Sequence, residues 1–140
     1  PFEGQTVFVC GSGRSLDDVG HLLPEAASKG PIICTNTGAQ ALQHYGVEPD
    51  AVFCAEALHL ADHFEGVHAP GVFDVLASPK NWGAVKKPIA ICRAEPNLLD
   101  YLVSIPVAPT NYACSALCGA VSQAFSWGAG GAPVRAITSR

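Results

Sequence analysis

The chain has 140 residues, of which 49% are hydrophobic and 14% are charged, and its formal net charge is −4. This composition is typical of one soluble domain with a well-filled core and excludes a disordered segment. The eight Lys and Arg residues are scattered, apart from the neighbours Lys86 and Lys87. Because no basic stripe is present to follow a phosphate backbone, we expect no nucleic-acid partner.

No apolar run reaches the roughly 20 residues of a membrane-spanning helix, and no secretory signal is present. We therefore predict a cytoplasmic protein without a membrane span. Methionine is absent, even at position 1. We interpret residues 1–140 as a single domain taken from a longer chain, whose further domains would be its partners.

Short apolar runs alternate with segments of helical spacing along the chain. The runs predict strands at residues 5–10, 31–35, 51–54, 72–77, 88–92 and 134–138. The spacing of apolar residues predicts helices at 15–28, 37–45, 58–64, 97–102 and 114–127. Continuous apolar strands that alternate with helices are typical of parallel sheets. We therefore predict an α/β fold, a Rossmann-like three-layer sandwich with a mainly parallel sheet and helices on both faces.

The six cysteines stand in these apolar elements. Four close predicted strands and two stand four residues apart in the last predicted helix: Cys10, Cys34, Cys54, Cys92, Cys114 and Cys118. A buried thiol behaves as a small apolar side chain, so we interpret them as core residues. The alternative is a metal or iron–sulfur site at the strand ends, but the chain has no Cys-x-x-Cys pair.

In parallel sheets of this kind, ligands bind beyond the carboxyl ends of the strands, where the strand order reverses. The residues that follow each apolar run are therefore the candidate site. They are rich in hydrogen-bonding groups and comprise Gly11-Ser12-Gly13-Arg14-Ser15, Thr35-Asn36-Thr37, Ala55-Glu56 with His59, Arg93-Ala94-Glu95 and Thr110-Asn111-Tyr112.

The turn at residues 11–15 matches no common phosphate-binding motif. Leu16 stands where the dinucleotide fingerprint has its third glycine, and no Gly-Lys-Ser/Thr follows for a P-loop. The two glycines still allow positive φ and close approach of a ligand, and the backbone N–H groups favour an anion. Ser15 and Asp18 have the spacing of a partial capping box. Alternatively, the segment is an ordinary turn with a capping serine.

Arg14 has two interpretations. Its guanidinium could bind phosphate through two parallel hydrogen bonds, or it could face solvent at the start of a helix.

Four further side chains at this edge are candidates for binding or catalysis. Asn36 would read a base or a ribose, or form a turn. Glu56 would bind Mg²⁺ or act as a general base, or lie solvated in a loop. His59 and His63, four residues apart on a predicted helix, would form a zinc site with Glu56 or Asp62.

Three segments together resemble a known family. V-C-G-S-G-R-S-L, I-C-T-N-T-G-A-Q-A-L and G-V-E-P-D-A-V-F-C-A-E are similar to the archaeal 6-hydroxymethylpterin diphosphokinases and flagellar motility accessory factors. The resemblance covers residues 5–56, with a weaker match at 110–138. The first two segments also resemble bacterial sialyltransferases with a single Rossmann-like domain.

The resemblance implies a nucleotide-dependent transferase. In the diphosphokinases, ATP with Mg²⁺ would pass diphosphate to the hydroxymethyl group of a pterin. In sialyltransferase-like relatives, a CMP-sugar would react with a glycan acceptor. When the family's residues are carried over by position, Glu56 would be the acidic residue that binds the metal ion and takes part in catalysis. The nucleotide would contact Gly11, Ser12, Gly13, Arg14, Ser15, Asn36, Thr110 and Ser115.

The chain departs from the family pattern in three places. Arg14 stands where the family usually has proline, and Glu56 stands where aspartate is more usual. The family also continues past its last strand into a glycine and an acidic residue, whereas this chain ends at Arg140. A further alternative is therefore a catalytically degenerate domain that serves as a structural or interaction module.

Overall fold

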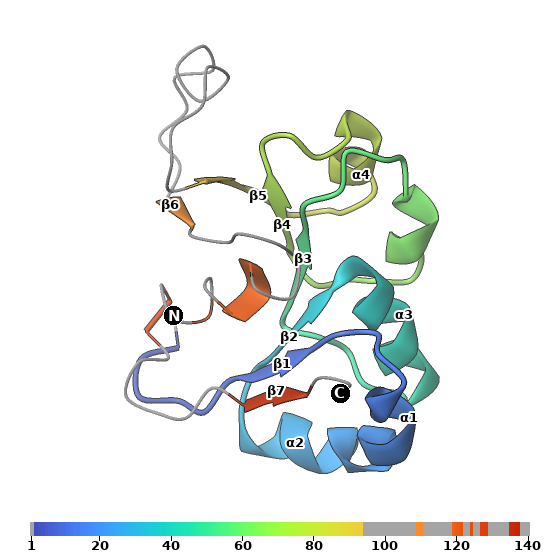
Figure 1. Cartoon of the computed structure of the whole chain (residues 1–140), viewed down its shortest axis with the longest axis vertical. Helices are drawn as coiled ribbons and strands as arrows, with labels where there is room; N and C mark the ends of the chain where they lie inside the picture. Colours follow the sequence, from blue (N-terminus) through green and yellow to red (C-terminus); the bar gives the residue numbers. More distant parts are fainter. Residues whose placement is uncertain are drawn as a thin grey trace.

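The computed structural model describes residues 2–93, 109–110, 119–121, 124, 127–128 and 135–137 (Figure 1). The strands within these residues are β1 Phe8–Cys10, β2 Ile32–Thr35, β3 Ala51–Cys54, β4 Gly71–Asp74, β5 Pro88–Arg93, β6 Pro109–Thr110 and β7 Arg135–Ile137. They pair in the order β6-β5-β4-β3-β2-β1-β7, and each described pairing is parallel.

The helices between successive strands cover one face of the sheet. The α-helices are α1 Ser15–Val19, α2 Leu23–Lys29, α3 Asn36–His44 and α4 Pro79–Gly83, and the 3₁₀ helices are η1 Gly20–Leu22 and η2 Ala61–Phe64. The chain steps from β1 to β5 in one direction, and right-handed crossovers in one direction place their helices on the same face. Residues 119–121 and 124, which are helical, lie on the opposite face (Figure 1). The predicted α/β three-layer fold is thus confirmed.

The alternation of side chains along the strands divides the core in two. In β3, Val52 and Cys54 pack beneath the helices, whereas Ala51 and Phe53 pack on the other face against residues that include Ala120. Every residue of β2, β3 and β4 is buried. This burial on both faces explains why the strands are continuous apolar runs in the sequence.

The predicted helix at 15–28 is interrupted in the structure. α1 ends at Val19, η1 follows, and α2 starts at Leu23. Pro24 has no N–H, so the carbonyl of Gly20 cannot accept the usual bond from four residues ahead and instead accepts from the N–H of Leu23. A single continuous helix was therefore the wrong prediction.

Three further elements differ from the prediction. The helix expected at 58–64 is limited to η2, which starts at Ala61, and α4 was not predicted. β4 ends at Asp74 instead of residue 77 because the Asp74 Oδ1 accepts from the N–H of Leu76 at 2.7 Å and turns the chain. The helix expected at 97–102 lies outside the described residues.

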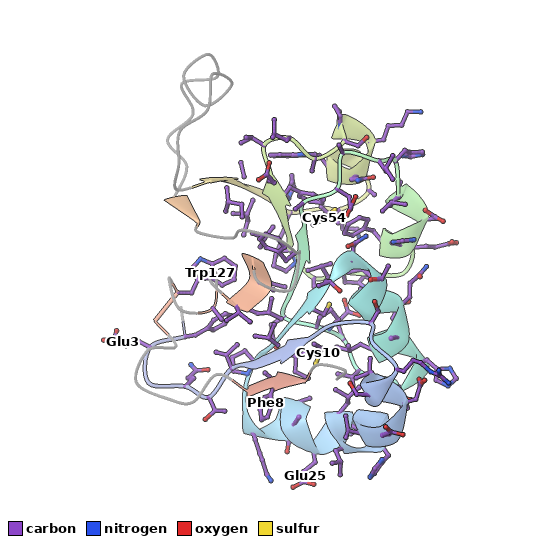
Figure 2. The ribbon with its side chains drawn as sticks, in the orientation of Figure 1. Glu3, Phe8, Cys10, Glu25, Cys54 and Trp127 are labelled. Atoms are coloured by element: carbon purple, nitrogen blue, oxygen red, sulfur yellow. The ribbon has the colours of Figure 1, made fainter. Side chains whose placement is uncertain are left out.

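The described strand-end thiols are core residues, as predicted. Cys10, Cys34 and Cys54 are free and fully buried, and Figure 2 places Cys10 and Cys54 inside the molecule. Burial raises the pKa of Cys10 to about 11 and also raises the pKa values of Cys34 and Cys54. They are therefore neutral thiols near pH 7. The side chain of Cys92 and both residues Cys114 and Cys118 lie outside the described part.

Candidate functional site

The candidate site lies where the strand order reverses. From β1 the chain steps through β2 to β6 on one side, and β7 then pairs with the other side of β1. The turn at residues 11–15 therefore follows the strand at which the direction changes, which is the position where parallel α/β sheets bind ligands.

The backbone of this turn leaves several donors open. The N–H of Leu16 donates to the carbonyl of Gly13 at 2.8 Å, and that of Asp17 donates to Arg14 at 3.0 Å. Within the described residues, no hydrogen bond is made by the N–H groups of residues 12–15. Consecutive open N–H groups carry partial positive charge and attract anions.

The roles expected for Ser15 and the glycines need correction. Ser15 is the first residue of α1, the N-cap residue is Arg14, and no side chain caps this helix. The Ser15 Oγ is instead buried and has no hydrogen-bond partner among the described residues. The described glycines with positive φ are Gly4, Gly46, Gly66 and Gly128, so backbone conformation does not explain Gly11 or Gly13.

Hydroxyl groups join this turn to the start of α3. The Ser12 and Thr37 hydroxyl oxygens are 2.8 Å apart, and the Thr35 Oγ1 caps α3 by accepting from the N–H of Gly38 at 3.2 Å. A Cβ at Gly38 would lie 3.1 Å from the carbonyl oxygen of Cys10, so glycine allows α3 to approach the end of β1. Thr37 is part of the predicted strand-end set, and the structure brings its hydroxyl to the turn although no nucleotide contact was predicted for it.

Asn36 is hydrogen-bonded to a histidine of the 3₁₀ helix η2. It is the first residue of α3, is only 4% exposed, and its Nδ2 lies 3.0 Å from the Nδ1 of His63 in η2. Because the amide nitrogen donates, Nδ1 accepts and the ring proton lies on Nε2. His59 precedes η2, so the two histidines do not share a helical face as the zinc hypothesis required. Among the described residues, no group of three His, Cys, Asp or Glu side chains is placed to bind a metal ion.

Glu56 lies in the loop that follows β3, with an exposed side chain and a fixed backbone. Its carbonyl accepts from the N–H of Ser78 at 3.1 Å and from the Nδ2 of Asn81 at 3.3 Å. Asn81 is fully buried and was missed in the sequence. Ser78-Pro79, a common start for a helix, was the available signal for α4.

Asp74 adds a carboxylate at the same edge. It is fully buried at the end of β4, and the pairing of Cys54 with Phe73 places it level with Ala55, next to Glu56. The sequence interpretation missed it because it fell within the strand predicted at 72–77.

The remaining predicted residues are Arg14, Thr110 and Ser115. Arg14 belongs to the turn and is exposed. Thr110 lies in β6, which is five strands from β1, and at about 4.8 Å per strand the separation is roughly 24 Å. The structure thus does not bring Thr110 to residues 11–15. Ser115 lies outside the described residues.

Comparisons with known proteins identify a family and a similar fold. A family model described as "6-hydroxymethylpterin diphosphokinase MptE-like" matches residues 1–113. The solved structure of a MAf glycosyltransferase from Magnetospirillum magneticum AMB-1 is similar, with a TM-score of 0.79 over 90% of this chain and 20% sequence identity. This chain covers 21% of that protein's length. A comparison with curated proteins gave no match.

Proposed function

This chain belongs to the 6-hydroxymethylpterin diphosphokinase MptE-like family, and from that premise we propose that it is the nucleotide-binding part of a transferase. The proposed reaction moves diphosphate from ATP to the hydroxymethyl group of a pterin. The turn at residues 11–15 holds the nucleotide phosphates. The proposal implies a cytoplasmic location, where ATP is supplied. None of the described helices could cross a membrane.

The observation that carries the proposal is the set of unused donors in this turn. The N–H groups of residues 12–15 and the buried Ser15 hydroxyl have no partners among the described residues. A buried hydroxyl without a partner is costly, and phosphate oxygens would accept from all of these groups. Arg14, an exposed residue of the same turn, supplies a cation for these phosphates.

In the proposed reaction, the acceptor's hydroxyl oxygen attacks the β-phosphorus of ATP. A new O–Pβ bond forms, the bond from Pβ to the oxygen bridging to the α-phosphate breaks, and that oxygen leaves with AMP. The hydroxyl proton is released. Residues 11–15 fix the phosphates in line with the attacking oxygen, and their N–H groups stabilise charge on the leaving AMP.

Glu56 is the residue that we propose to bind Mg²⁺ at this edge. The ion usually takes one or two carboxylates and completes its shell with phosphate oxygens and water. Glu56 is exposed after β3, and the ion pair found within the described residues joins Lys29 to Glu25, so the Glu56 carboxylate is not held by a cation there. Bound there, Mg²⁺ would neutralise phosphate charge during transfer.

Calorimetric titration tests this proposal with ATP alone, ATP with Mg²⁺, and CMP. Tighter binding of ATP with Mg²⁺ than of CMP supports the diphosphokinase assignment. A Gly13→Asp variant, which places a carboxylate against the phosphates, should abolish ATP binding while the protein stays folded. Binding of neither nucleotide would contradict the proposal and leave the structural or interaction module as the explanation.

A second candidate is a glycosyltransferase that uses a CMP-sugar and a glycan acceptor. The observation in its favour is the fold shared with the MAf glycosyltransferase over 90% of this chain. The turn would then hold the single phosphate of CMP, and the reaction would proceed without metal. Preferential binding of CMP in the same titration, unaffected by Mg²⁺, would support this candidate over the first.

A further inference from the structure

The loop between β3 and η2 is held by one buried side chain. Asn81 in α4 is fully buried, and its amide makes hydrogen bonds in both directions. Its Oδ1 accepts from the N–H of Leu60 at 2.8 Å, and its Nδ2 donates to the carbonyls of Leu58 at 2.8 Å and Glu56 at 3.3 Å. Three backbone groups of residues 56–60 thus depend on this residue.

The loop itself buries few side chains that could hold it. Residues 56–59 are exposed, and Leu58 is 68% exposed. Apolar packing therefore contributes little to its conformation, and the polar contacts with the start of α4 must define it. Asn81 supplies three of these contacts, and the N–H of Ser78 supplies one more to the carbonyl of Glu56.

α4, which carries Asn81, packs against the sheet. α4 packs on β4 through Trp82, whose ring stacks on Phe73 with centroids 5.3 Å apart, and the Trp82 Nε1–H donates to the carbonyl of Ala77 at 3.2 Å. Packing of α4 on the sheet therefore sets the position of Asn81, and the hydrogen bonds of Asn81 set the position of the loop.

We infer that Asn81 is a positioning residue, which fixes the backbone of residues 56–60 and thereby directs the Glu56 carboxylate toward the ligand edge of the sheet. The role of Glu56 as a Mg²⁺ ligand rests on the function proposed above. The hold of Asn81 on the loop does not, and the two parts are tested separately.

Amide hydrogen exchange tests the hold on the loop in the nucleotide-free protein. In Asn81→Ala, the Leu60 amide loses its acceptor and should exchange at least tenfold faster, while the Val52 amide in β3 changes much less. Trp82→Phe is the matched control, because it keeps an aromatic ring against Phe73 and removes only the hydrogen bond to Ala77, which is not a contact of the loop. Equal acceleration at Leu60 and Val52 would show that Asn81 only supports the whole fold and would overturn the inference.

Nucleotide titration tests the effect on Glu56. Asn81→Asp keeps the shape of the side chain and an acceptor for Leu60 but faces the Glu56 and Leu58 carbonyls with a carboxylate. We expect the gain in ATP affinity from Mg²⁺ to fall at least tenfold, and metal-free ATP affinity to change less than twofold. A full Mg²⁺ gain in this variant would refute the positioning of Glu56. If the unaltered protein binds no ATP, the proposed function fails, and hydrogen exchange still decides whether Asn81 holds the loop.

Discussion

Replacing Ser15 by alanine tests the central observation at the turn. The Ser15 Oγ is buried and has no partner among the described residues, although the residue is only partly buried as a whole. If this hydroxyl is a ligand-binding group, it destabilises the ligand-free protein and strengthens the binding of the nucleotide. Ser15→Ala should therefore raise stability and weaken nucleotide binding.

The magnitude of both effects follows from the burial of one polar atom. An unsatisfied buried hydroxyl costs about 1–3 kcal/mol, and alanine is better than serine in a helix by about 0.5 kcal/mol. We expect a gain near the lower end, about 1 kcal/mol, because Ser15 is not fully enclosed. For a domain of this size, that raises Tm by about 3 °C. Loss of a hydrogen bond to charged phosphate costs about 1.5–3 kcal/mol, which weakens ATP binding roughly 10-fold to 150-fold.

Thermal unfolding and calorimetric titration of the same preparations provide the assay. Ser12→Ala is the control for stability, because its hydroxyl is bonded to Thr37 at 2.8 Å and its loss should lower Tm slightly. The reasoning is refuted if Ser15→Ala lowers Tm and leaves ATP affinity within twofold. The hydroxyl would then stabilise the folded protein and play no part in nucleotide binding.

Three further predictions follow from contacts elsewhere in the molecule. A Cβ at Gly20 would lie 2.2 Å from the Tyr45 ring, so Gly20→Ala should cost about 1–3 kcal/mol of unfolding free energy by chemical denaturation, and the cost should shrink in a Tyr45→Ala background. Burial raises the pKa of Cys10 to about 11, above its value in the unfolded chain. The contribution of the neutral thiol to folding stability is therefore fully present below pH 9, and about 2–3 kcal/mol of it is lost as the pH rises from 9 to 11. Cys10→Ala should flatten this part of a profile of unfolding free energy against pH. Since the Nδ1 of His63 accepts from Asn36, nitrogen NMR at neutral pH should show the Nε2–H tautomer, and Asn36→Ala should give a mixture of tautomers; an unchanged tautomer would contradict this contact.

The strands could be predicted from the sequence because strands that are buried on both faces form continuous apolar runs. In β2 and β3 every residue is buried, and the apolar runs coincide with the strands to within a residue. The interruption between α1 and α2 was harder to predict, since Leu16, Val19, Leu22 and Leu23 keep helical spacing across it. The spacing of apolar residues indicates which side of a helix faces the core. It gives no information about the backbone hydrogen bond that Pro24 cannot donate.

The candidate site was predictable only in its location. The prediction of a mainly parallel sheet correctly placed Ser12, Asn36 and Glu56 at one edge of that sheet. Their partners come from distant segments, since Asn36 contacts His63, and Asn81 reaches Glu56 across 25 positions of sequence. Such pairs depend on the packing of η2 and α4, which local spacing does not encode.

The order of the strands has a consequence for the course of folding. Phe8 of β1 pairs with Ile32, 24 positions away, but also with Arg135, which is 127 positions away. Closing the longer loop costs about 1.5 kcal/mol more entropy by the logarithmic length rule. β1 to β5 can add one after another through local crossovers, whereas β7 can pair with β1 only once residues 135–137 are available. During synthesis, β1 would therefore remain an unpaired edge on that side until residues 135–137 emerge, and an unpaired strand edge favours aggregation.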